Sequence, residues 1–239
     1  NQGMNGRSEQ FVTVGNSVGD LDYKLSLGAR KDDGFKERYD GKKLSIANFR
    51  GDFQATNNDV VTFLGTYSSG EYQEDSTERL NPSMPDHLKD VVQESQQIKW
   101  IHNLSSNDAF TLNYYQQYFN DKNTYTGDFT ADGYGFVFIN ESVVTKRKNM
   151  DFAYSRYSDV YSFTLGALYR IDNTIAPEYL FDTDKDIITK QFFVNAEFHL
   201  NENDALNVDL LHDDNDTGGK TLSPRISLNH QINKMQNVD

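Results

Sequence analysis

The feature that most constrains this chain is an alternation of apolar and polar residues with a period of two, which recurs about ten times. It is clearest in residues 160–171, where one parity reads Tyr, Phe, Leu, Ala, Tyr and Ile. The other parity is mostly small or polar and carries Arg170. Because successive side chains of a strand point to opposite faces, each such segment predicts a β-strand with one apolar face. At about 3.3 Å per residue, residues 160–171 reach about 35 Å, enough for a tilted strand to cross a membrane.

The same pattern divides most of the chain into strands. Besides residues 160–171, the alternating segments are residues 9–14, 21–30, 43–55, 60–72, 96–104, 109–120, 148–157, 190–200, 206–210 and 222–232. Leu44 and Ile46 lie on the opposite parity from Phe49 and Phe53, which indicates a β-bulge near Ile46. The sequence therefore predicts an all-β fold of about 10–12 antiparallel strands.

The connections between these segments alternate in length. The short ones are residues 16–20, 56–59, 105–108, 158–159 and 201–204, and the long ones are 31–42, 73–93, 121–146, 172–189 and 213–221. An up-and-down transmembrane β-barrel has this asymmetry, with short periplasmic turns and long outer loops. A soluble β-sandwich also alternates apolar and polar residues, but it has no reason to keep its long loops at one end. We therefore predict a transmembrane β-barrel segment, with residues 136–139 forming a strand beyond the membrane.

Composition excludes several other classes. The chain has 239 residues, 36% of them hydrophobic, and a mean hydropathy of −0.73. No apolar run approaches the length of about 18 residues that a transmembrane helix needs, whereas barrel strands place only alternate residues in lipid. A net charge of −13 argues against nucleic acid as a partner, since phosphate binding needs basic patches. The absence of cysteine excludes disulfides, thiolate zinc sites and a cysteine nucleophile.

Three stretches carry a likeness to a known family. They are YKLSLGAR followed by DGF in residues 23–35, WIHNL followed by ND and LNYY in residues 100–115, and LSPRISL in residues 222–228. In this order and spacing they resemble TonB-dependent outer-membrane receptors, which import scarce nutrients such as ferric siderophores, haem or cobalamin. Such receptors are 22-stranded barrels with a plugged lumen. The resemblance implies that residues 1–239 form one partial outer-membrane β-barrel domain, without the plug domain and the C-terminal strands.

The resemblance also implies partners and a location. The partners are outer-membrane lipid, the plug domain and TonB complex of the full-length protein, and a small-molecule or metal-chelate substrate. The location is the bacterial outer membrane. No cofactor is expected, and the chain is not expected to be an enzyme. It contains no Gly-x-Ser-x-Gly motif, no phosphate-binding glycine loop and no dinucleotide fingerprint.

Two sets of residues are candidates for function. The first set consists of charged residues on the polar parity, which face the lumen of a barrel, where the resemblance makes plug side chains their partners. They are Arg30, Arg50, Asp52, Arg170, Glu197 and Arg225. The second set lies in the long loops and is suited to line a ligand site, since such sites are mostly apolar with a few polar groups. It comprises His87, Tyr125, Phe129, Tyr134 and Phe136. For the four aromatic residues a packed loop hairpin is the alternative, whereas His87 is the histidine best placed to capture haem or a metal and has a structural role as its alternative.

The sequence contains no complete metal-binding motif. The five histidines show no spacing typical of a metal site. The acidic runs that begin at Asp182 and Asp213 lack residues that a calcium-binding EF-hand loop requires, and Pro224 stands where the second run needs glutamate.

Two alternatives to the receptor remain open on these observations. A passive porin-like outer-membrane channel would share the strands and loops, but it would need neither plug nor energy coupling. A soluble secreted β-sheet protein that binds carbohydrate or another protein would pack its Phe and Leu parities inside, and it would be monomeric without detergent.

Overall fold

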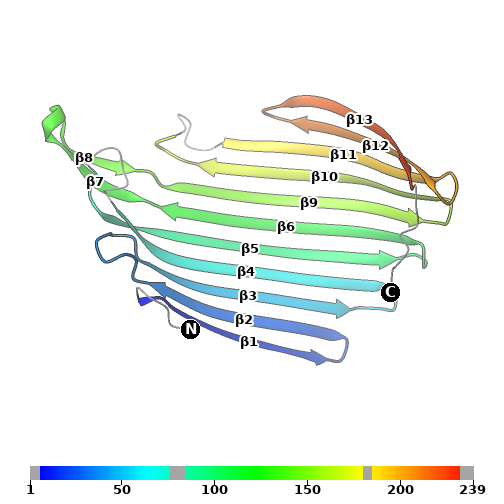
Figure 1. Cartoon of the computed structure of the whole chain (residues 1–239), viewed down its shortest axis with the longest axis horizontal. Helices are drawn as coiled ribbons and strands as arrows, with labels where there is room; N and C mark the ends of the chain where they lie inside the picture. Colours follow the sequence, from blue (N-terminus) through cyan, green and yellow to red (C-terminus); the bar gives the residue numbers. More distant parts are fainter. Residues whose placement is uncertain (1–5, 76–83, 180–184, 232–239) are drawn as a thin grey trace.

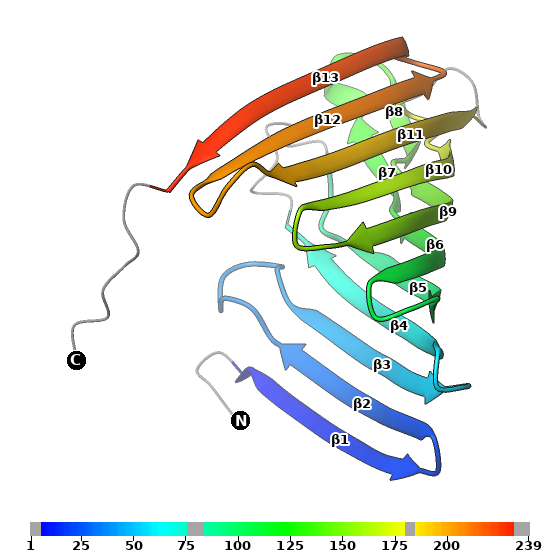
Figure 2. The ribbon, with the colours of Figure 1, turned by 90° about the vertical axis from the view of Figure 1, so that its right-hand side faces the viewer.

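The structure is a computed structural model that describes residues 6–75, 84–179 and 185–231. Its main element is one antiparallel sheet of 11 strands, in the order β1-β2-β3-β4-β5-β6-β9-β10-β11-β12-β13. The strands lie side by side in chain order (Figure 1), and the sheet curves strongly from β1 to β13 (Figure 2). Strands β7 and β8 form a separate two-stranded hairpin. The all-β fold and the predicted number of sheet strands are confirmed.

The strand bounds agree with the alternating segments, and most strands extend further at the end that carries the long loops. In the described residues they are β1 Ser8–Val18, β2 Leu21–Asp32, β3 Lys42–Gln54, β4 Asp59–Glu74, β5 His87–Asn103, β6 Asp108–Lys122, β7 Thr124–Phe129, β8 Gly135–Asn140, β9 Val143–Tyr157, β10 Tyr161–Ile175, β11 Lys185–His199, β12 Asp204–Asn215 and β13 Gly219–His230. The predicted strand at residues 136–139 is the core of β8.

The pairing register corrects one local prediction. Leu44 and Ile46 pair with consecutive partners on both β2 and β4, so β3 has no bulge near Ile46. Both residues instead belong to the polar parity, near the loop end of the strand. Leu44 packs there against Gly70, whose missing Cβ would lie 3.0 Å from the Leu44 Cδ1. Leu44 and Ile46 are therefore two apolar residues on the otherwise polar face of β3, and they do not mark a shift of register.

The connections confirm the predicted alternation of short and long, with one exception. Short turns join β1–β2, β3–β4, β5–β6, β9–β10 and β11–β12 at one end of the sheet. Longer connections lie at the other end, and residues 76–83 and 180–184 of these are outside the described residues. The predicted long loop at 213–221 is wrong, because β12 runs to Asn215 and β13 begins at Gly219. The Asn215 side chain accepts hydrogen bonds from the backbone amides of Thr217 and Gly218, and Gly219 supplies a positive φ of 72°.

The apolar parity of the strands is the more exposed face of the sheet. Ile98 is 47% exposed and Ile226 is 73% exposed, whereas the polar neighbours of Ile98, Gln97 and Lys99, are half-buried. In the described residues, Tyr125 and Ala176 are the only buried hydrophobic residues. A contiguous exposed apolar face of this size marks a surface that contacts lipid or a partner. The apolar side chains of the sheet therefore lie mainly on its more exposed face.

The height of the apolar face matches a bilayer. On β10 it comprises Tyr161, Phe163, Leu165, Ala167, Tyr169 and Ile171. These residues span about 33 Å along the strand, which a tilt near 40° reduces to about 25 Å, the usual height of the apolar band of a barrel. Beyond Tyr169, towards the loop end, the same face of the sheet becomes polar, as at Gln116 and Lys148. The strands therefore extend beyond the apolar band at the loop end.

An aspartate holds each of three short turns to the next hairpin. In each turn the side chain three residues before the aspartate donates a hydrogen bond to the aspartate Oδ2. These pairs are Thr56–Asp59 at 2.5 Å, Ser105–Asp108 at 2.8 Å and Asn201–Asp204 at 2.6 Å. The aspartate Oδ1 contacts a group at the end of the following neighbour strand. These groups are His102 Nδ1, Tyr154 Oη and His230 Nδ1, each at 2.7 Å. We call these three arrangements the turn clasps.

The exposed apolar face predicts that an introduced charge destabilises the protein on that face far more than on the polar face. Arginine at Leu165, in the middle of the apolar band of β10, should lower the free energy of unfolding in lipid vesicles by about 2–4 kcal/mol, because the charge enters hydrocarbon. The matched control is Thr164→Arg, one residue away on the polar face, which should cost far less. Equal costs for Leu165→Arg and Thr164→Arg would contradict this assignment of the faces.

The first turn clasp predicts a pH dependence of stability. Asp59 ends the 56–59 turn outside the apolar band, and hydrogen bonds from Thr56, His102 and Trp100 lower its pKa from 3.8 to about 2. Because the folded-state pKa is lowered, the stabilisation is complete above about pH 4 and disappears as the pH falls to about 2. The difference in unfolding free energy between the native protein and Asp59→Asn should shrink over that range in urea titrations. Asn57→Ala, in the same turn, should show no such pH dependence, and a constant difference for Asp59→Asn would contradict the clasp.

Candidate ligand-binding site

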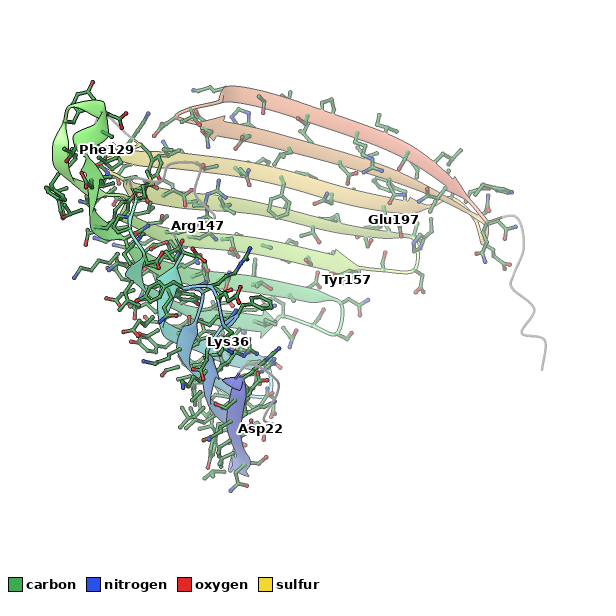
Figure 3. The ribbon with its side chains drawn as sticks, turned by 60° about the vertical axis from the view of Figure 1, so that its left-hand side comes forward. Asp22, Lys36, Phe129, Arg147, Tyr157 and Glu197 are labelled. Atoms are coloured by element: carbon green, nitrogen blue, oxygen red, sulfur yellow. The ribbon has the colours of Figure 1, made fainter. Side chains whose placement is uncertain are left out.

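A two-stranded hairpin projects from the loop end of the sheet. Strands β7 and β8 lie between β6 and β9 in the chain, and they extend away from the sheet at the end opposite the short turns (Figure 1). Figure 3 shows Phe129 near the end of this projection, while Arg147 and Glu197 lie on strands of the main sheet. A ligand that approaches the loop end of the sheet would meet this hairpin first.

The base of the hairpin is a closed network of polar side chains. The Tyr125 hydroxyl donates a hydrogen bond to Glu141 Oε1 at 3.0 Å, and its ring stacks on His87 with centroids 4.2 Å apart. His87 Nε2 lies 2.7 Å from Asn123 Oδ1, and Asn123 Nδ2 donates to Glu141 Oε2 at 3.2 Å. Tyr125 is 6% exposed and Asn123 is 7% exposed. The network joins the start of β5 to both ends of the hairpin, so it fixes how the hairpin leaves the sheet.

The structure therefore brings together two residues that the sequence proposed as ligand contacts, His87 and Tyr125. Their polar atoms are engaged inside the protein, and the Tyr125 ring is buried. In this geometry both residues position the hairpin. A direct role for either in binding stays a prediction.

The far end of the hairpin presents aromatic side chains to solvent. Tyr134 is 77% exposed and Phe136 is 76% exposed, while Phe129 is half-buried. Phe138, which is 67% exposed, lies two residues after Phe136 on the same face of β8. The turn between the strands contains the short 3-10 helix η3, Thr130–Asp132, and positive φ angles of 86° and 73° at Gly133 and Gly135. We call Tyr134, Phe136 and Phe138 the aromatic tip.

The aromatic tip includes one residue that the sequence predictions missed. Phe138 was read only as part of an extended strand, although it shares its parity with Phe136. Opposite these two rings, Thr126 and Asp128 occupy the same face of β7. The Thr130 hydroxyl and backbone amide donate hydrogen bonds to Asp128 and lower its pKa, so the carboxylate stays charged beside the rings. Flat rings can stack on such a surface.

The predicted lumen-facing charges share the polar face of the sheet, but they do not form one cluster. Most are paired within the wall. These pairs are Arg30–Glu9 at 2.5 Å, Arg50–Asp52 at 2.6 Å, Arg170–Asp172 at 3.0 Å and Glu197–His199 at 2.8 Å. Arg225 lies opposite Asp209 in the β12–β13 register. The pairs lie on strands from β1 to β13, so the charged residues of the polar face do not gather at one site.

No group of three or more His, Asp or Glu side chains in the described residues is placed to hold a metal ion. Among the same residues, no helix is long and apolar enough to cross a membrane.

Comparisons with known proteins identify the fold. No family model matches the chain, and no curated protein matches it. Among solved structures, the siderophore receptor PirA from Pseudomonas aeruginosa is similar over 94% of this chain, with a TM-score of 0.70 and 12% identity. A mutant of the ferric enterobactin receptor PfeA from the same species is similar over 98%, with a TM-score of 0.74 and 11% identity. PirA from Acinetobacter baumannii is similar over 97%, with a TM-score of 0.71 and 13% identity.

These likenesses concern the fold. The chain spans 38% of the length of the Pseudomonas PirA, 40% of PfeA and 39% of the Acinetobacter PirA. At identities of 11–13% the side chains of a binding site cannot be transferred from these receptors to this chain. What matches is the overall course of the strands, with TM-scores of 0.70, 0.74 and 0.71.

The network at the base of the hairpin predicts a local loss of stability. Tyr125→Ala removes a buried ring and its hydrogen bond to Glu141, and it should make opening of β7 and β8 easier by about 3 kcal/mol. Amide hydrogen exchange of the hairpin would measure this change. The matched control, Tyr134→Ala at the exposed tip, should leave the exchange rates nearly unchanged. Equal effects of the two substitutions would show that the network does not hold the hairpin.

Proposed function

We propose that this chain forms part of the wall of a TonB-dependent outer-membrane receptor that imports a scarce nutrient, such as a ferric siderophore, haem or cobalamin. The observation that carries the proposal is the exposed apolar face, whose height is that of a bilayer, on a sheet with the strand order of siderophore receptors. The resemblance of residues 23–35, 100–115 and 222–228 to this receptor family supports the same conclusion.

The loop end of the wall favours a receptor over a passive channel. Strands β4, β5 and β6 have 15–17 residues, whereas a tilted transmembrane strand needs only about 9–11. The excess lies at the loop end, where the wall rises above the apolar band and carries the projecting hairpin. The aromatic tip is then held outside the membrane, in the path of a ligand that arrives from the medium.

The aromatic tip also favours one kind of ligand chemistry. Exposed Tyr and Phe rings bind flat apolar or aromatic groups by stacking, and each such contact contributes about 1 kcal/mol. A chelate whose iron-binding groups are aromatic rings, or a porphyrin, offers such surfaces. The charged Asp128 beside the rings favours a ligand that carries a hydrogen-bond donor or a positive charge at its edge.

Uptake measurements test the receptor and separate it from a channel. In an iron-starved strain that carries the full-length protein, labelled ferric siderophore, haem or cobalamin should enter with saturable kinetics that depend on TonB. Loss of the gene should abolish uptake of one of the three. Uptake that is linear in concentration and independent of TonB would support the porin-like channel, and no uptake of any of the three would remove the receptor.

The aromatic tip should matter for affinity. The double variant Tyr134→Ala, Phe136→Ala should bind the imported ligand about thirtyfold more weakly in equilibrium titrations, because two stacking contacts of about 1 kcal/mol each are lost. The control is Phe35→Ala, an exposed aromatic in the β2–β3 loop, which should bind normally. Unchanged affinity of the double variant would place the ligand site elsewhere on the receptor.

A further inference from the structure

One histidine joins two neighbouring hairpins at the short-turn end of the polar face. His199 is the last residue of β11, and its Nδ1 lies 2.9 Å from the backbone carbonyl oxygen of Asp159 in the turn between β9 and β10. Its Nε2 lies 2.8 Å from Glu197 Oε1 on its own strand, which Figure 3 shows near this end of the sheet. We call His199 with its two acceptors, Asp159 and Glu197, the histidine latch.

The latch is complete only when the imidazole carries a proton on both nitrogens. A backbone carbonyl oxygen and an ionised carboxylate accept hydrogen bonds and cannot donate them. The imidazolium form of His199 donates to both Asp159 and Glu197, whereas the neutral ring has one N–H and turns a lone pair towards one of the two oxygens. The geometry therefore favours the charged ring.

The electrostatic surroundings of the latch act in the same direction. The hydrogen bond to the Asp159 carbonyl, followed by that to Glu197, raises the pKa of His199 above its ordinary value of 6.5. His199 lies one residue beyond the pair Tyr161–Phe198, where the apolar band of β10 begins. The side chains of His199 and Glu197 are 42% and 39% exposed, so water reaches the latch and limits its strength.

A hollow of about 600 Å³ adjoins the latch on the polar face. Titratable groups from three elements line it together with His199: Asp159 from the 158–159 turn, Glu202 and Asp204 from the 201–204 turn, and His230 from the end of β13. The Nδ1 atom of His230 lies 2.7 Å from Asp204 Oδ1, in the third turn clasp. The carboxylates of this set, with Glu197, favour the charged form of His199.

We propose that His199 is a pH-sensitive latch, which holds the 158–159 turn against β11 while its ring is charged and releases the turn when its ring is neutral. The backbone amide of His199 still donates to the Val160 carbonyl at 2.8 Å, so release loosens the turn without unpairing the strands. Asp159 and Val160 line the hollow, so a loosened turn widens it.

The sign of the pKa shift defines the pH range of the latch. Because the folded-state pKa of His199 is raised, the stabilisation is complete below about pH 6.5 and is lost as the pH rises through the folded-state pKa. Asp204 responds in the opposite direction, since hydrogen bonds from His230 and Asn201 lower its pKa from 3.8. Its stabilisation is present above about pH 4 and is lost as the pH falls. The short-turn end is therefore tightest in a mildly acidic medium.

Hydrogen exchange in the full-length protein in lipid vesicles tests the latch. Exchange of the amides of residues 158–161 is measured at pH 5.5 and 8.5 and corrected for the intrinsic effect of pH on exchange. Protection of the native turn should fall about threefold at the higher pH, the size expected for an exposed charged pair. His199→Gln should abolish this dependence because glutamine does not titrate. The 105–108 turn is the internal control, since Tyr154 takes the place of the histidine in its clasp, and its protection should stay constant.

A direct titration gives a second measurement. In full-length protein with isotope-labelled histidine, the NMR signal that disappears in His199→Gln should titrate above pH 6.5, and Glu197→Gln should lower its midpoint. The matched control is His212→Gln, on the opposite face of β12, which should leave both the midpoint and the protection of the turn unchanged.

Three results would overturn the latch. They are equal protection of the native turn at pH 5.5 and 8.5, a threefold loss that persists in His199→Gln, and a His199 signal that titrates at or below pH 6.5. Folding of every variant is checked by the heat-dependent shift in gel mobility that folded barrels show.

Discussion

The structure depends on one constraint, which is that backbone amides and carbonyls in hydrocarbon must find partners within the protein. The 11-stranded sheet meets it with continuous antiparallel registers from β1 to β13. Because the backbone amides and carbonyls bond to one another between strands, the side chains can be apolar on one face of the sheet and polar on the other. In the proposed membrane setting, the outer edges of β1 and β13 require the same pairing, and a wall that spans about two fifths of the matched receptors is compatible with further strands.

The two faces explain most of what lies at the ends of the wall. The apolar face ends in turn clasps at the short-turn end and in polar residues such as Gln116 and Lys148 at the loop end, so each boundary has its own polar chemistry. At the short-turn end, Asp59, Asp108 and Asp204 connect each turn to the next hairpin through side-chain contacts. At the loop end, the strands overhang the apolar band and support the projecting hairpin. One end of the wall is thus held together by the turn clasps, and the other end carries the projecting hairpin with the aromatic tip.

Sequence reasoning predicted the features that depend on local pattern. The segment 160–171 became most of β10 because period-two alternation indicates both a strand and its faces, and the continuous apolar patch at 136–139 became the core of β8. The prediction of a long loop at 213–221 was wrong because polar residues continue both strands beyond the apolar band, where the apolar–polar pattern no longer marks where a strand ends. The stacking of His87 on Tyr125 joins residues 38 positions apart, and no local pattern encodes it. The turn clasps had a signal, since Asn-Asp closes the turns at 58–59, 107–108 and 203–204.

The central claim is that the apolar face of the wall contacts lipid, and the absence of cysteine from the chain makes a direct measurement possible. Single cysteines placed at residues 161–165 and 167–171 can carry spin labels in the full-length protein in lipid vesicles; Gly166 is left out because a side chain there would clash with Phe193 and the Phe152 backbone. We expect oxygen to collide most often with labels at 163, 165 and 167, and a water-soluble nickel reagent to collide most often with those at 162 and 164. Ready access of the nickel reagent to residues 163, 165 and 167 would contradict it.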